Sequence, residues 1–339
     1  MQNILGLAWS MAYIVLVLIV ATLVAKFSRG ASESSRKLVH ILVGNWVFLI
    51  PLFTDLWAVV LVPFTFIIVN SLSLKYRLIA AMERSDDSLG TVYYAISMFV
   101  LSGAAFVLKW PVLAYTGLLT MAYGDGLAAI IGGRWAKARP FAFAPQRSLA
   151  GSLTVAVVAF VVTALSLFIL EDGAPSAVLT VLLIALLNAV LSAFIELTGK
   201  RGSDNLSLPV GSGLFAVLAW RFGSPGLLLY LLLAVLILAI AFKAHAITPD
   251  GIVAALLTAL TLYTLGDVWI ATALLLFFIL GSGVSKLKND SKRLAETIQE
   301  GDGPRNWKQV LCNSLPAVAL VWMHYFLPGQ RFLLLLALG

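Results

Sequence analysis

The chain has 339 residues, of which 61% are hydrophobic and 12% are charged. Soluble domains carry about 25% charged residues, so this composition excludes a soluble globular protein and predicts a chain made mostly of membrane-spanning helix. The net charge of +7 is typical of the Lys and Arg excess in cytoplasmic loops, and we expect no nucleic-acid partner. The single cysteine, Cys312, excludes an intrachain disulfide.

The hydropathy pattern predicts an all-α, polytopic transmembrane helix bundle of about 12 spans. The runs at 39–53 and 206–220 are short, and we expect re-entrant or broken helices there. Residues 331–339 resemble the start of a further span. The apolar runs occupy residues 4–25, 39–53, 56–74, 91–108, 110–131, 150–170, 176–197, 206–220, 226–242, 249–265, 267–285 and 309–327.

The distribution of basic residues predicts the orientation of this bundle. With the N-terminus outside, all lysines and arginines except Lys109, Arg221 and Arg331 fall in inside loops. This bias satisfies the positive-inside rule and indicates a cytoplasmic face, which we expect at a bacterial inner membrane. A change of composition after the ninth span predicts two regions, residues 1–242 and 243–339.

The first polar motif lies at the cytoplasmic entrance of the second span. Arg36, Lys37 and His40 share one helix face, because residues three and four apart are neighbours. Two cations and an imidazole on one face suit a phosphate ligand. Membrane anchoring explains Arg36 and Lys37 equally well, but it does not explain His40.

The second motif is the run from Tyr123 through Gly124, Asp125 and Gly126. Asp125 is predicted about 9 Å inside the end of its span, where a carboxylate is costly and indicates function. The flanking glycines allow a ligand to approach the backbone, and a carboxylate suits Mg²⁺. The alternative is a helix break capped by Asp125.

A basic loop follows, and it ends at the entrance of the next span. It contains Arg134, Arg139 and Arg147, and the next helix begins at Ser148 with Gly151 in its first turn. A helix N-terminus attracts phosphate, so the loop is a candidate nucleotide contact. A basic loop with an ordinary helix cap is the alternative.

The next acidic groups lie on either side of a short loop. Glu196 is at the inner end of one span, and Asp204 and Asn205 open the next. Because the loop is brief, we expect both carboxylates to face one cytoplasmic pocket and to supply a second acidic site beside Asp125. The alternative is that Asp204 or Asn205 caps a helix.

Together these motifs resemble the membrane CTP-dependent polyprenol kinases, dolichol kinase and, more closely, phytol kinase. The resemblance covers about 30–220 and depends on the order and spacing of all the motifs. One position departs from the family pattern Lys-Ser-x-Glu-Gly-Ser, because Arg147 replaces the lysine and Ala150 the glutamate. The matching segments are Arg36 to His40 with Gly44, Tyr123 to Lys137, Arg147 to Ser152, Glu196, and Asp204 to Pro209.

The region after residue 243 resembles the front part of a second family, which includes plant phytyl-phosphate kinase. The resemblance is carried by Gly251 and Ala254, by a lysine-rich loop, and by the run Arg305 to Asn313. The two kinases would catalyse consecutive steps on one lipid. The lysine-rich loop contains Lys286, Lys288, Lys292 and Arg293.

The resemblance implies phosphoryl transfer from a nucleoside triphosphate, expected to be CTP, to a long-chain isoprenoid alcohol, with Mg²⁺ as cofactor. It implies catalytic roles for Asp125, His40 and Lys37, and magnesium binding by Asp125 with Glu196 or Asp204. Nucleotide contacts would come from Arg36, Gly124, Gly126, Arg134, Arg147, Ser148, Gly151 and Asn205.

Two other functions fit parts of the pattern. Phosphatidate cytidylyltransferases share the general membrane architecture, but their long C-terminal signature is missing here. Transporters also use broken helices and intramembrane charges. The charges of this chain are predicted at the cytoplasmic ends of the spans, which favours the kinase.

Overall fold

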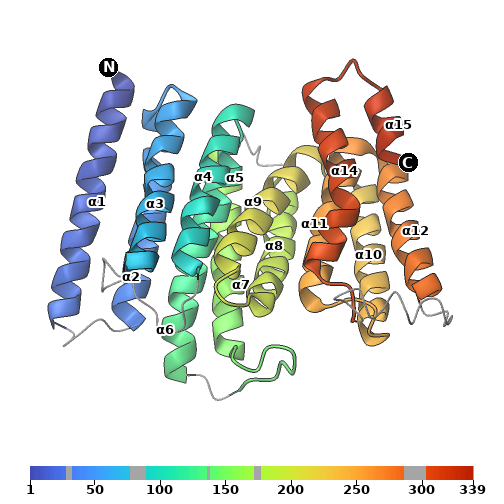
Figure 1. Cartoon of the computed structure of the whole chain (residues 1–339), viewed down its shortest axis with the longest axis horizontal. Helices are drawn as coiled ribbons and strands as arrows, with labels where there is room; N and C mark the ends of the chain where they lie inside the picture. The colour runs from blue at the N-terminus through green and yellow to red at the C-terminus, as the bar shows by residue number, and fades with distance from the viewer. Residues whose placement is uncertain (28–32, 77–88, 136–137, 172–176, 286–302, 339) are drawn as a thin grey trace. The chain divides into compact units, whose positions relative to one another are not determined.

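A computed structural model describes residues 1–27, 33–76, 89–135, 138–171, 177–285 and 303–338 (Figure 1). These residues form helices joined by short connections, and no strand occurs within the described ranges. The expected all-helical class is therefore confirmed. The fold divides into two compact units, Met1–Trp220 and Arg221–Gly339.

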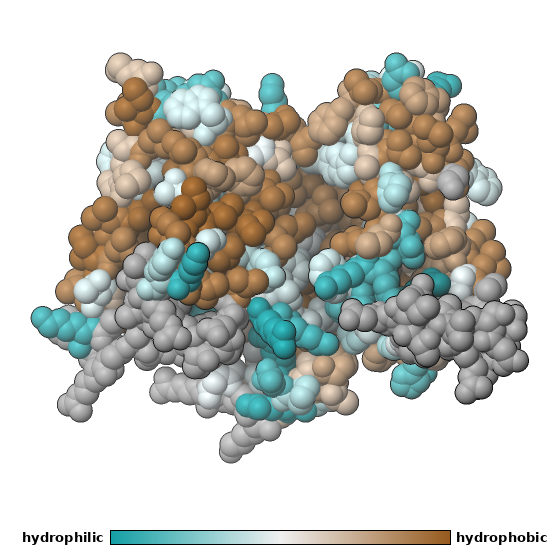
Figure 2. Space-filling model, in the orientation of Figure 1, coloured by the Kyte–Doolittle hydropathy of each residue, from teal (hydrophilic) through white to brown (hydrophobic). Residues whose placement is uncertain are grey.

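In the part of the chain that the structure describes, seven helices are long and apolar enough to cross a membrane, and five of them lie in the first unit. Two shorter apolar helices, Lys37–Leu52 and Val268–Gly281, accompany them. Apolar side chains cover the length of the helices in each unit (Figure 2). The expected total of about 12 spans and the outside N-terminus stay predictions.

The first unit is built from helices that run alternately up and down in Figure 1. Hydrophilic side chains gather at the lower end of this unit (Figure 2). Its long helices are α1 (Gln2–Phe27), α3 (Leu56–Tyr76), α4 (Gly90–Leu108), α7 (Leu149–Leu170), α8 (Val178–Thr198) and α9 (Asp204–Phe222).

The second helical segment of the chain begins as an α-helix and ends as a 3₁₀ helix. The α-helix α2 (Glu33–Gly44) continues as the 3₁₀ helix η1 (Asn45–Leu52), which contains Pro51. Pro51 lacks a backbone donor, and this favours the irregular turn. The irregularity expected within 39–53 is thus present, whereas α9 runs unbroken through 206–220 and contradicts the break expected there.

The helix that carries Asp125 contains a wide turn. The α-helix α5 (Pro111–Leu119) passes into the π-helical segment η3 (Thr120–Asp125) and then into α6 (Gly126–Trp135). The chain therefore does not break at Asp125, as the capping alternative required. A π turn within an α-helix is rare and often marks a functional site.

A buried polar network joins four helices above the charged end of the unit. Asn188 of α8 donates hydrogen bonds to Thr163 of α7 (2.8 Å) and to the Ser212 hydroxyl of α9 (3.0 Å). Ser212 in turn contacts Thr120 of η3 at 3.3 Å. Hydrogen bonds of this kind hold apolar helices in register, so they fix the elements that carry the acidic residues.

The second unit begins at Arg221, and its first helix is α10 (Pro225–Lys243). The division predicted after residue 242 therefore lies within this unit, at the end of α10. Its other elements are α11 (Pro249–Thr261), η5 (Leu262–Gly266), α12 (Val268–Ser285), α14 (Trp307–Phe326) and α15 (Phe332–Leu338).

The N-termini of α11 and α14 meet in this unit through a short backbone bridge. Thr248 donates its backbone N–H to the carbonyl of Arg305, and Arg305 donates to the carbonyl of Ala246. Asn306 then caps α14 together with Gln309 in a capping box. The lysine-rich loop between residues 286 and 302 lies outside the described residues.

Candidate active site

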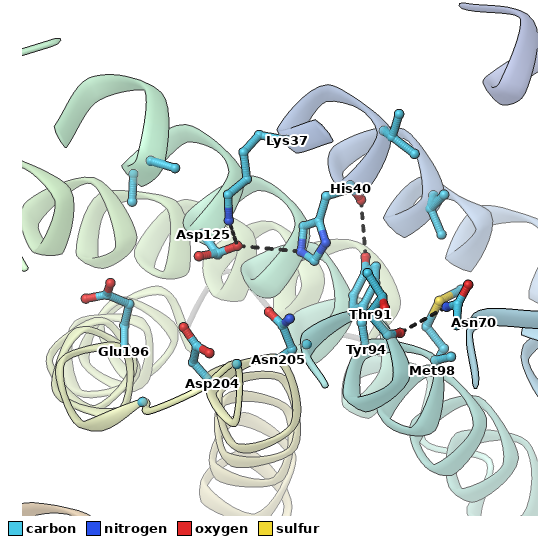
Figure 3. Close-up of a pocket in the computed structure, with 18 of the residues that line it drawn as sticks. Lys37, His40, Asn70, Thr91, Tyr94, Met98, Asp125, Glu196, Asp204 and Asn205 are labelled. Atoms are coloured by element: carbon cyan, nitrogen blue, oxygen red, sulfur yellow. Dashed lines mark hydrogen bonds and ion pairs between the residues drawn. The ribbon is translucent and has the colours of Figure 1, made fainter. Parts of the chain in front are cut away.

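A cavity of about 1160 Å³ opens at the lower end of the first unit. Its wall combines residues from four of the polar motifs, which are far apart in the sequence. Figure 3 shows six of these side chains around one space, namely those of Lys37, His40, Asp125, Glu196, Asp204 and Asn205. The predicted residues that line the cavity are Lys37, His40, Asp125, Arg147, Ser148, Gly151, Glu196, Asp204 and Asn205.

Lys37 and Asp125 form the ion pair at the centre of this wall. Lys37 Nζ lies 2.5 Å from Asp125 Oδ2, and the side chains are 15% and 7% exposed. A buried carboxylate is costly without a compensating charge, so Lys37 stabilises Asp125 in its ionised form. This ion pair joins the π turn η3 to the first turns of α2 on one wall of the cavity.

His40 lies beside this pair and is held by an aromatic ring. His40 Nε2 is 3.8 Å from Asp125 Oδ2. The ring of Tyr94 from α4 stacks on the imidazole at 4.1 Å between centroids, and the Tyr94 hydroxyl donates to the His40 carbonyl at 3.4 Å. The imidazole is therefore fixed between a carboxylate and an aromatic face, as Figure 3 shows.

Arg147 joins the two other carboxylates of the cavity. One guanidinium nitrogen lies 2.5 Å from Glu196 Oε1, and another lies 2.6 Å from Asp204 Oδ2. Ser152 adds a contact to Glu196 at 3.4 Å. The loop before α7, the end of α8 and the start of α9 are thus tied by one side chain, which uses the fork of donors that arginine provides.

This arrangement changes the acid–base behaviour of Arg147. Burial disfavours its charged form, but the carboxylates of Glu196 and Asp204 outweigh burial and raise the pKa of the Arg147 guanidinium above its ordinary value. Arg147 therefore remains a permanent cation in the wall. Its role in the structure is to hold two carboxylates, and its predicted phosphate contact stays a prediction.

The glycines of the motifs mainly allow close packing. A Cβ atom on Gly126 would meet Ile41 of α2 at 2.5 Å, and one on Gly132 would meet the Ser148 hydroxyl at 2.8 Å. Ser148 caps α7 by accepting a hydrogen bond from the N–H of Gly151. Gly124 packs near Val155, and neither Gly124 nor Gly126 lines the cavity.

Two predicted nucleotide contacts are only partly described. Arg36 lies in α2 and Arg134 lies near the end of α6, and their side chains are outside the described part of the structure. Both helices border the cavity, so the backbone places these residues close to the site.

The cavity has a second, apolar half that sequence reasoning missed. Beside the ion pairs, apolar side chains from α1, α3 and α4 continue its wall as a groove. Tyr94 and Asn70 lie where the two halves meet, and Asn70 donates to the Thr91 carbonyl at 3.0 Å. Isolated polar residues inside apolar spans were the available signal for Asn70 and Tyr94.

The oxygen donors of the wall suit a hard cation such as Mg²⁺. Within the described residues, however, no three acidic, histidine or cysteine side chains are gathered as a metal cluster. Mg²⁺ commonly takes one or two carboxylates and completes its shell with water and substrate phosphates. The donor set therefore fits Mg²⁺ together with a phosphate ligand, with Asp125, Glu196 and Asp204 as the available carboxylates.

A known protein is similar in sequence to more than half of this chain. The chain is 34% identical over 207 residues to a phytol kinase from Synechocystis sp., an alignment that covers 60% of this chain and 87% of the relative. The chain belongs to the phytol kinase family. The resemblance seen in the motifs is thereby confirmed for the first region.

The end of the chain matches a second description. Residues 232–339 match the family model described as integral membrane protein DUF92. Together with the apolar helices, this match identifies an integral membrane protein. No solved structure matches the chain.

Proposed function

We propose that this member of the phytol kinase family is a membrane kinase that transfers the terminal phosphoryl group of a nucleoside triphosphate to the hydroxyl of an isoprenoid alcohol. The observation that carries the proposal is the cavity itself, which joins a charged end to an apolar groove. An isoprenoid alcohol is divided in the same way, because it carries one polar hydroxyl at the end of an apolar hydrocarbon chain. The name of the Synechocystis relative, phytol kinase, supports this assignment.

The charged end supplies what phosphoryl transfer requires. In the reaction the alcohol oxygen forms a bond to the terminal phosphorus, the bond between that phosphorus and its bridging oxygen breaks, and a nucleoside diphosphate leaves. Catalysis of this kind is mainly positioning and charge neutralisation. We assign Lys37 to neutralise the transferred group, because it lines the cavity. Arg36 and Arg134 stay predicted phosphate contacts.

The alcohol proton needs an acceptor at the same point. His40 and Asp125 are the candidates, because they lie 3.8 Å apart at the junction of the charged end and the groove. Tyr94 orients His40 for either of two roles, as the base or as a donor to phosphate. We assign the proton to this pair of residues.

Magnesium would neutralise phosphate oxygens when it is bound, and Asp125, with Glu196 or Asp204, would hold it. Lys37 forms an ion pair with Asp125, and Arg147 forms ion pairs with Glu196 and Asp204, so the two cations hold these three carboxylates in place. We expect CTP as the donor from the resemblance to the polyprenol kinases, and we place the charged end at the cytoplasm because of the basic bias of its loops.

The direct test is incubation of the purified protein in lipid nanodiscs with CTP labelled on the terminal phosphate and with a panel of prenols. A kinase releases CDP and produces a labelled prenyl phosphate. Release of pyrophosphate with a cytidylated lipid would show a cytidylyltransferase instead. Uptake of a prenol into vesicles without nucleotide hydrolysis would show a transporter.

A further inference from the structure

We propose that the groove between α1, α3 and α4 holds the hydrocarbon tail of one prenol, and that its closed end at Leu7 limits the length of that tail. The inference rests on the proposed function, because the tail is that of the alcohol substrate. It adds a specificity-determining residue that lies far along the chain from the charged motifs.

Stripes of apolar side chains form the groove. On α1 the apolar lining residues recur three or four positions apart, which places them on one helix face. Apolar residues of α3 and α4 line the same space. These apolar residues are Leu7, Met11, Ile14, Val17 and Leu18 on α1, Leu61, Val62, Phe66 and Val69 on α3, and Ala95 and Met98 on α4.

The depth of the groove matches a hydrocarbon chain of moderate length. Leu7 and Leu18 bound the α1 stripe, and their separation corresponds to about 16 Å along the helix axis. Half of the hydrocarbon core of a bilayer is about 15 Å, which is the length of one lipid tail. A prenol of four isoprene units has a main chain of sixteen carbons, similar to a common lipid tail.

The far end of the groove is closed where α1 is tied to the start of α3. Asn3 accepts a hydrogen bond from the Thr54 N–H at 2.8 Å and also donates to Asp55. One turn later, Gly6 packs so closely on the Phe53 ring that a Cβ atom would lie 2.8 Å from it. A longer chain therefore cannot continue past Leu7 along α1.

The side of the groove is open to lipid, which gives the tail a route of entry. Met11 and Leu18 line the groove and are 58% and 48% exposed. Tyr13, which lies between them, holds α1 to α2 by donating to the Leu42 carbonyl, and Ser10, just before Met11, accepts from Trp46. A prenol in the bilayer can thus enter sideways while α1 remains attached.

The proposal is tested by changing the closed end in both directions. Leu7→Trp fills the end of the groove, and Leu7→Ala extends it. Leu5→Trp is the matched control, because Leu5 lies half a turn away, is 54% exposed and does not line the groove. Each variant is assayed for kcat/KM with prenols of two, three, four, five and more isoprene units.

We expect Leu7→Trp to lower the ratio of kcat/KM for the four-unit prenol over the two-unit prenol by about tenfold, the usual effect of one or two methylenes that no longer fit a pocket. Leu7→Ala should raise the use of the five-unit prenol relative to the four-unit one. Leu5→Trp should retain the wild-type profile. The same profile in all four proteins would overturn the groove assignment.

Failure of the proposed function gives a different result, since the wild-type protein would then phosphorylate no prenol of any length. A second measurement does not depend on turnover. A four-unit prenol with a photoreactive group on its last unit should label the first three turns of α1 in the wild-type protein and lose this label in Leu7→Trp. Labelling confined to α7 or α8 would overturn the proposal.

Discussion

The two compact units place a partly buried arginine in opposite surroundings. In the first unit, Arg147 lies between Glu196 and Asp204, and the two carboxylates raise its pKa. In the second unit, Arg305 lies against the Phe278 ring at 5.3 Å and near the Phe278 carbonyl, and burial lowers its pKa. A cation paired with acids is suited to a charged site, whereas a cation on a ring and a carbonyl mainly serves packing.

The same contrast holds for the acidic residues. Among the described residues, the buried carboxylates are Asp125, Glu196 and Asp204, and all three belong to the first unit. The buried polar side chains described in the second unit are the hydroxyls of Thr258, Thr261 and Ser314. We therefore expect the first unit to catalyse prenol phosphorylation. Substitutions at the cavity of the first unit should lower this activity, whereas substitutions in the second unit should change only the stability of the protein.

The largest expected effect is that of Asp125→Asn. We expect kcat to fall by at least about 100-fold, because the variant removes a preorganised charge from the phosphoryl-transfer site. Labelled CTP and a four-unit prenol measure the loss, and fractionation checks that membrane insertion persists. Asp250→Asn in the second unit is the matched control and should remain fully active. Full activity of Asp125→Asn would refute the assignment.

The next effect is on stability, and it compares the two arginines directly. Arg147→Ala leaves two buried carboxylates without their cation and should destabilise the first unit by about 3 kcal/mol. Arg305→Ala removes a ring contact and should cost about 1 kcal/mol. Thermal unfolding in one detergent measures both. Arg147→Lys should recover part of the loss, since lysine is a point charge and cannot bridge both carboxylates equally. Equal losses for the two alanine variants would contradict the contrast.

Tyr94 tests whether His40 must be held in place. Tyr94→Leu removes the stacked ring and should lower kcat/KM about fivefold to tenfold, since aromatic contacts of this kind contribute about 1 kcal/mol. Tyr94→Phe keeps the ring and should restore the rate to within about threefold. If the phenylalanine variant is as slow as the leucine variant, the stacking argument is wrong.

The smallest difference concerns two helix caps. Ser148→Ala and Asn306→Ala each remove a capping side chain and should each cost about 1 kcal/mol of stability. Only Ser148 lines the cavity of the first unit, so only Ser148→Ala should also lower prenol phosphorylation. Parallel unfolding and activity assays separate the two effects. An equal loss of activity in Asn306→Ala would contradict the assignment of the activity to the first unit.

Much of the charged end could be predicted from the sequence, because intramembrane charges are rare and stand out. Asp125 is predicted for this reason, and Lys37, His40, Glu196 and Asp204 are predicted because they lie at the cytoplasmic ends of spans. All five residues line one cavity. The sequence does not predict which of these charged side chains form ion pairs with one another. The basic motif favoured a phosphate contact for Arg147, but only the packing of α7, α8 and α9 places two carboxylates against its guanidinium.

Features without a composition signal were missed. The π turn at Thr120–Asp125 adds no distinctive residue, so periodicity could not predict it. The helix α9 looked short because Ser212 and neighbouring small residues lower its hydropathy, although they are buried in helix contacts. The groove is lined by apolar residues that resemble those of any lipid-facing span, so only their arrangement in space reveals it.

The ion pairs can form only in a fixed order while the chain is being synthesised. Lys37 precedes its partner Asp125 by 88 residues, and Arg147 precedes Asp204 by 57. Each cation therefore leaves the ribosome and reaches the bilayer before its carboxylate exists, and an unpaired charge within lipid is costly. We therefore expect Lys37 and Arg147 to stay at the water interface until the later helices arrive, and the site to close only after the chain has been made through α9.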